Sequence, residues 1–337
     1  MMKEERKEHI DREEKVKELT EKLEAGVKDL FESDRYRHFL EVMSRFPRYS
    51  ANNCVLIAMQ KPDAVAVGGF QHWKKMGRSV APGEKGLQII QPAPRRVYRW
   101  ETVRDEDGNI VYNDDGSEKK IRVPHEYMGF TVGYVWDYSQ TIGPPGTELP
   151  SMVKLLDGDA KNGEALLKAL EATSSATISY EDYNDRSNGY FDRTNNRIVV
   201  KASLPALQKI KTLAHERSHE ALHSDGGIEE DANRHEKEVE AESISFIILN
   251  YFGISCEDYS FGYIQSWSSG RDLPELQTKL EIIRKTAYEM IEEIENEMVR
   301  QRVVEVEIEE EREMTAEATV VCVQYDKPQR HIAHRRR

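Results

Sequence analysis

Two histidines and a glutamate in the segment LAHERSHEALH have the types and spacing of a metal-dependent hydrolytic site. His215 and His219 stand four residues apart, and Glu216 directly follows the first histidine. In a helix, residues i and i+4 share a face, so both imidazoles can bind one metal ion while Glu216 reaches a water on that ion. The motif predicts one zinc ion, with manganese as the alternative, held by His215 and His219, with Glu216 as the general base.

The third ligand is expected on the next predicted helix, because a catalytic zinc takes three protein ligands and keeps one open position. That helix, residues 232–250, carries a row of carboxylates: Glu236, Glu238, Glu240 and Glu242. We predict Glu240, because Ala241 beside it is small enough to let two helices approach closely. The alternative is that the row is an acidic, solvated face, which must hold for most of these glutamates. His223 lies about 6 Å further along the helix axis, so it is predicted to pack or to support the site.

The elements around this motif predict a second, mostly helical domain. A β-hairpin is expected over residues 189–200, turning at 194–196, and it is followed by the motif helix, 205–223. Amphipathic periodicity also predicts helices over residues 163–173 and 273–298.

The first half of the chain predicts a different mixture of secondary-structure elements. Helical patterns cover residues 1–34 and 39–46, the second ending at Pro47, and are followed by glycine-rich turns and short β-like runs. Residues 101–124 predict a polar hairpin insert, and GPPGTELP at 143–150 predicts a linker. We therefore expect an α+β protein of two domains, 1–145 and 151–298, and a charged extension, 299–337, of unassigned role.

The charge distribution predicts a nucleic-acid surface within an acidic protein. The net charge is −13, yet residues 35–100 hold twelve basic and three acidic residues, a local charge of +9. Single-stranded DNA needs cations for its phosphates and aromatic faces for its bases. The candidates are Arg45, Arg48, Tyr49, Asn52, Asn53, Trp73, Lys74, Lys75, Arg78 and Lys85. The alternative for the aromatic members, Trp73 above all, is a place in the core.

Composition excludes several other classes. The chain has 337 residues, 38% of them hydrophobic, and no run approaches the roughly 18 apolar residues that cross a bilayer. Its opening has no apolar stretch of a secretory signal, so we expect a cytoplasmic protein without a membrane partner. The three cysteines are far apart, which argues against a disulfide framework and a thiolate zinc site.

The chain resembles two known families over most of residues 35–250. IVV at 198–200, HERSH at 215–219 and EAES at 240–243 resemble the zinc metallopeptidases of the ImmA/IrrE kind. The stretches 39–64, 67–90 and DYSQT at 137–141 resemble the N-terminal domain of ArdC-type antirestriction proteins. The resemblance implies an N-terminal domain that binds single-stranded DNA, a C-terminal metallopeptidase-like domain, and a place on plasmids or conjugative elements. The insert at 101–124 and the extension after about 300 have no counterpart in it.

Three functions agree with these observations. The leading one is an antirestriction protein of a mobile element that binds single-stranded DNA and carries a zinc peptidase site acting on an unidentified protein substrate. The second is a regulatory peptidase that cleaves a repressor, with DNA only localising or activating it. The third is a DNA-binding protein with an inert peptidase fold, which the intact Glu216 disfavours.

Overall fold

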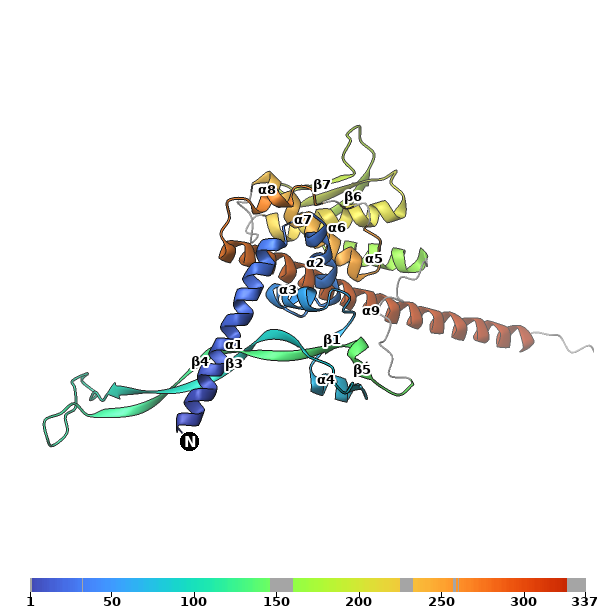
Figure 1. The fold of residues 1–337 in the computed structure, drawn as a ribbon. Helices are drawn as coiled ribbons and strands as arrows, with labels where there is room; N and C mark the ends of the chain where they lie inside the picture. Colours follow the sequence, from blue (N-terminus) through green and yellow to red (C-terminus); the bar gives the residue numbers. More distant parts are fainter. Residues whose placement is uncertain are drawn as a thin grey trace, which may run out of the picture. The chain divides into compact units, whose positions relative to one another are not determined.

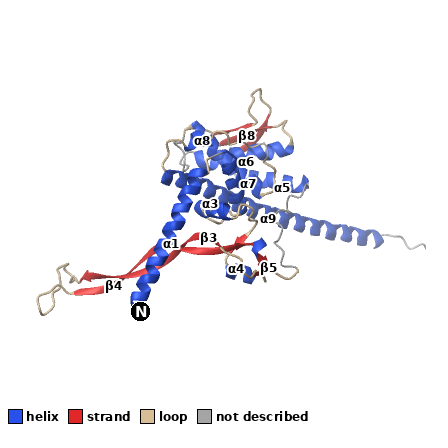
Figure 2. Ribbon diagram, viewed as in Figure 1, coloured by secondary structure: helices blue, strands red, loops and turns tan. Residues whose placement is uncertain are grey.

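The computed structural model describes residues 2–31, 33–145, 160–224, 233–256, 259 and 261–325. The predicted α+β class is confirmed: helices and three small sheets alternate along the chain (Figures 1 and 2). The chain forms two compact units, of which the first comprises Met1–Met152 with Glu238–Lys285 and the second Val153–Lys237 with Thr286–Arg337.

Four helices build the N-terminal part of the first unit: α1 (Met2–Asp29), α2 (Ser33–Arg45), α3 (Ala51–Gln60) and α4 (Phe70–Lys75). As predicted, α2 ends before Pro47, whose ring cannot continue a helix. Ser50 starts α3 as its N-cap, accepting a hydrogen bond from the Asn53 amide. Their apolar faces form the core of this unit, with Leu23, Phe39, Leu40, Met43 and Ile57 all buried.

Later segments of the chain complete the first unit. The Tyr36 hydroxyl lies 2.9 Å from the Ser243 hydroxyl on α7 (Arg234–Tyr251), and Asn250 donates to Ser44 at 2.6 Å. Burial raises the pKa of Tyr36, so this hydroxyl stays protonated. At the start of α9 (Leu273–Tyr325), Glu281 accepts from the Ala51 amide at 2.7 Å. These contacts explain why residues 238–285 group with the N-terminal helices.

A long two-stranded ribbon dominates the sheet structure of the first unit. Strand β3 (Leu87–Thr102) pairs antiparallel with β4 (Lys120–Asp137), from Leu87↔Val135 to Thr102↔Lys120. Figures 1 and 2 show it as one twisted hairpin, and the predicted insert 101–124 is its far end. Short strands β1 (Val67–Gly68), on β4, and β2 (Ser79–Val80) with β5 (Thr141–Ile142) complete the sheets.

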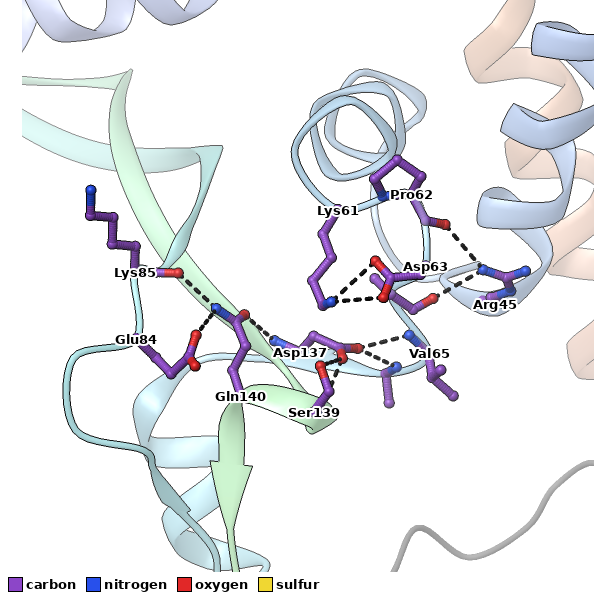
Figure 3. A network of polar contacts seen from close by, with 12 residues as sticks. Arg45, Lys61, Pro62, Asp63, Val65, Glu84, Lys85, Asp137, Ser139 and Gln140 are labelled. Atoms are coloured by element: carbon purple, nitrogen blue, oxygen red, sulfur yellow. Dashed lines mark hydrogen bonds and ion pairs between the residues drawn. The ribbon is translucent and has the colours of Figure 1, made fainter.

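A network of hydrogen bonds joins the near end of the ribbon, around Asp137, to the loops that contain Val65 and Glu84 (Figure 3). The Asp137 carboxylate accepts from the Val65 and Ala66 amides at 2.7 and 3.0 Å and from the Ser139 amide at 2.9 Å. Gln140, in the 3-10 helix η1 (Tyr138–Gln140), bonds both the Asp137 amide and the Glu84 carboxylate. The DYSQT segment is thus a capping box that fixes local structure.

The second unit holds a three-stranded sheet in the order β6-β8-β7, with β6 (Thr177–Glu181) parallel and β7 (Gly189–Asp192) antiparallel to β8 (Arg197–Lys201). The predicted hairpin at 189–200 is confirmed. Asn196 has φ +44° in its turn, where asparagine is tolerated better than most residues. Helix α5 (Ala160–Ala172) contacts α6 (Ala206–His223), and α6 contacts β7 and β8.

Two sequence predictions fall partly outside the described residues. Residues 146–150 of the predicted linker and residues 326–337 of the extension lie outside them. Helix α9 continues to Tyr325, well past the predicted end at 298. A further short helix, α8 (Ile264–Ser268), was not predicted. Within the described part of the chain, no helix combines the length and apolar character needed to cross a membrane.

Candidate metal centre and candidate nucleic-acid surface

Helix α6 brings the two predicted histidine ligands together. Their Nε2 atoms lie 3.1 Å apart, and both rings are half-buried. Two nitrogens bound to one tetrahedral zinc at about 2.0–2.1 Å are separated by about 3.3 Å. The spacing of His215 and His219 therefore fits a single ion. His223 is buried, and its Nδ1 lies 3.1 Å from Nδ1 of His219, so it supports the second histidine from behind.

Glu216 lies on the side of α6 that faces strand β7. It is 7% exposed, and a Cβ placed on Gly189 of β7 would come within 3.4 Å of its Cγ and 2.6 Å of a Thr212 methyl. Only glycine fits this close approach of strand to helix. The tight crossing holds Glu216 beside the two histidines on a rigid element, as a general base requires.

A buried ion pair within α6 ties this helix to the segment that follows α5, and the sequence did not reveal it. Arg217 and Glu220 lie 2.9 Å apart, with side chains only 5% and 6% exposed. Glu220 accepts from the Ser175 and Ala176 amides at 2.7 and 2.9 Å, and Arg217 donates to the Leu170 carbonyl at 2.8 Å. Burial lowers the pKa of Arg217, while Glu220 opposes that shift. The sequence signal for this ion pair was that Arg217 and Glu220 stand among mostly buried residues of α6.

The carboxylates of α7 differ sharply in their surroundings. Glu240, the predicted third ligand, is fully buried, and its Oε1 lies 3.0 Å from the Lys279 ammonium of α9. Glu238 is exposed. On α6, His215 and His219 are the side chains whose type and position suit a shared metal ion. Lys279, which the sequence analysis did not single out, thus neutralises the carboxylate that we predicted as a ligand.

Five of the predicted DNA-binding residues remain at the surface of the first unit. Exposed side chains belong to Arg45, Arg48, Lys74, Lys75 and Lys85. Arg45 also donates to the Ala64 carbonyl at 3.1 Å, which ties its guanidinium to a loop (Figure 3). Tyr49 and Asn52 are half-buried, and burial raises the pKa of the Tyr49 hydroxyl.

Three predicted DNA-binding residues belong instead to the interior. Trp73 is 1% exposed, and its indole nitrogen donates to the Trp136 carbonyl at 2.9 Å, so it cannot stack on a base. Asn53 pairs through both its side-chain atoms with the backbone of Ile90, at 2.9 Å each. Arg78 is buried, bonds Thr141 and lies 4.0 Å from the Tyr138 ring centroid. Each was chosen for its residue type alone, which does not reveal these tertiary partners.

Family models match both halves of the chain. Residues 11–132 match the N-terminal domain of anti-restriction factor ArdC. Residues 174–292 match the IrrE N-terminal-like domain of peptidase family M78, which includes the histidine motif. Both families of the predicted resemblance are therefore found, each over the expected half.

Individual relatives are distant. An uncharacterized protein of Bacillus anthracis is 24% identical over 322 residues, covering 86% of this chain and 53% of the relative, so the chain spans about half the length of that protein. Crystal structures of the antirestriction ArdC protein from the R388 plasmid, metal-free and Mn(II)-bound, are both 18% identical, with TM-scores of 0.43 and 0.41. They cover 75% and 74% of this chain and are themselves covered to 86% and 85%. Similarity at this level carries no argument about the site.

Proposed function

Because the chain is an ArdC-type protein that joins an ArdC N-terminal domain to an IrrE-like domain, we propose that it is a DNA-binding antirestriction protein with a metal-dependent peptidase site. The observation that carries the peptidase half is the 3.1 Å separation of the His215 and His219 Nε2 atoms, with Glu216 next in the helix. The ion is zinc, since two imidazoles and a carboxylate are typical ligands of a catalytic zinc, and manganese, which carboxylates also suit, is the alternative.

The third ligand is a carboxylate of α7, and two candidates compete. Glu240 remains our first choice from the sequence, although it requires Lys279 to release its ion pair. Glu238, two residues earlier in α7, is exposed and is the second candidate. Metal content separates the two, because only the true ligand's replacement by alanine lowers it.

The reaction that the residues support is hydrolysis of a peptide bond. A divalent ion held by His215 and His219 would supply an activated water, because the ion would lower the pKa of that water. Glu216 accepts the proton of that water and returns it to the leaving amine, which is the work of a general base that then acts as an acid. The protein substrate is unidentified.

Single-stranded DNA is the proposed partner of the first unit. The exposed cations Arg48, Lys74, Lys75 and Lys85 can each neutralise a phosphate, and the ArdC-type domain covers all of them. This role places the protein in the cytoplasm of a cell that receives a mobile element. A regulatory peptidase that cleaves a repressor, and a DNA-binding protein with an inert peptidase fold, are the alternatives.

Metal analysis of the full chain tests the site. After dialysis against a mild chelator, the wild type should keep about one equivalent of zinc, and His219→Ala should keep none. His125→Ala, which removes a half-exposed histidine of the ribbon, is the matched control and should keep the wild-type content. Retention of the full equivalent by both His219→Ala and His215→Ala would show that the metal lies elsewhere.

DNA binding is tested separately with fluorescent oligonucleotides. Affinity should favour single strands over duplex and fall with salt at a log-log slope of about −0.7 per phosphate neutralised. A wild-type chain that binds no oligonucleotide at low salt would refute the DNA-binding half.

A further inference from the structure

The β3–β4 ribbon has two unlike faces. Side chains alternate across a strand, and the register places even-numbered residues of both strands on one face. The odd-numbered face is covered at its near end, where Leu87, Ile89 and Val135 are buried. Helix α1 packs against both strands, and its Glu13 lies 3.3 Å from Arg95, also odd-numbered. One face of the ribbon is thus held by the protein's own core.

The even-numbered face carries aromatic side chains that are exposed. Tyr98, Trp100, Phe130 and Tyr134 are 50%, 67%, 53% and 48% exposed, and we call these four residues the aromatic face. Same-face neighbours on a strand are about 7 Å apart, so Tyr98 and Trp100 are adjacent, whereas Phe130 and Tyr134 lie several residues nearer the base of the ribbon. Large apolar side chains gathered on one exposed face mark an interaction site.

Basic residues are interleaved with these rings. Arg96, Lys120 and Arg122 share the even-numbered face, and the Arg122 guanidinium lies 4.7 Å from the Tyr98 ring centroid. The only acidic residue of the two strands on this face is Glu126, which is paired with Arg96. The ribbon tip is different, since it carries Asp105, Glu106, Asp107, Asp114 and Asp115. An anionic partner is therefore favoured along the strands and repelled from the tip.

We propose that the aromatic face of the ribbon is where this protein stacks the bases of single-stranded DNA, with Arg96, Lys120 and Arg122 contacting the phosphates. Rings interleaved with cations are what a sequence-tolerant single-strand surface requires, since every base offers a π-face. The inference rests on the proposed DNA-binding function and gives it a site. The aromatic face takes over the base-stacking role predicted for Trp73, whose ring is enclosed in the core.

Trp100 provides the test, because it is the one exposed tryptophan of the four in the chain. Titration of the full chain with oligo(dT) at low salt should quench tryptophan emission in the wild type. Trp100→Phe should lose most of the quenching and keep its affinity within about twofold, because a phenyl ring still stacks. Trp100→Ala should bind at least about fivefold more weakly, since one base–aromatic stack is worth roughly 1–3 kcal/mol.

Matched variants locate the effect. Phe130→Ala should weaken binding as Trp100→Ala does, whereas Tyr112→Ala, which removes a 58% exposed ring from the acidic tip, should not. The inference fails if wild type binds oligo(dT) and both Trp100→Ala and Phe130→Ala bind it equally well, and the proposed function then survives. It also fails if anionic phospholipid vesicles quench Trp100 and oligo(dT) does not. If the wild type binds no DNA, the DNA-binding half of the proposed function itself falls.

Discussion

Helix α6 and the β3–β4 ribbon place their functional candidates in opposite surroundings. On α6, His215, Glu216 and His219 stand on a helix that is clamped by a buried ion pair and crossed closely by a glycine of β7. On the ribbon, four aromatic rings project from a face that the described residues leave exposed. The first arrangement suits chemistry, which needs fixed geometry, and the second suits sequence-tolerant binding, which needs accessible surface.

Removing Glu220 should break the first arrangement with the largest effect on stability. Glu220→Ala removes the nearer carboxylate partner of the buried Arg217, leaving, among the described residues, only Glu293 at 4.0 Å, and takes the acceptor from two backbone amides, which should lower the free energy of unfolding by about 3–5 kcal/mol. Thermal or urea unfolding measures this. Glu164→Ala, which removes an exposed partner of Lys168, is the control and should leave the melting temperature nearly unchanged. Equal stability of the two variants would show that the ion pair does not hold α6.

The two tryptophans Trp73 and Trp100 sharpen the contrast between core and surface. Trp73→Ala should destabilise the protein by about 3–5 kcal/mol, because it empties a buried site and removes a hydrogen bond to Trp136. Trp100→Ala should cost no more than about 0.5 kcal/mol. Urea unfolding followed by circular dichroism measures both. The assignment of Trp73 to the core would be wrong if the two values were alike.

The neighbouring residues Asn53 and Asn52 give a smaller test of the same contrast. Asn53→Ala strands the amide and carbonyl of Ile90 on β3, so we expect a loss of about 1–3 kcal/mol. Asn52→Ala should change the free energy of unfolding little, since the Asn52 side chain is only half-buried and keeps access to water. Should Asn53→Ala leave stability intact while weakening DNA binding, the original sequence prediction for Asn53 would be restored.

The sequence predicted local features better than distant contacts. The spacing of His215 and His219 fixes their separation once the segment is helical, and Pro47 and the turn at 194–196 act on their own neighbours. The roles of Trp73, Asn53 and Arg78 depend instead on Trp136, Ile90 and Thr141, each more than 30 residues away. Residue type indicated aromatic and basic surface, but only strand register shows which rings share an open face.

The central claim, that α6 carries a metal-dependent peptidase site, is tested most directly by Glu216→Gln. This variant keeps size and helix propensity and removes the base. Zinc content and hydrolysis of fluorescent casein should be measured on the same purified full-length protein. We predict about one equivalent of zinc in both proteins and at least about a hundredfold slower hydrolysis in the variant. Loss of zinc in Glu216→Gln, or hydrolysis at the wild-type rate, would contradict it.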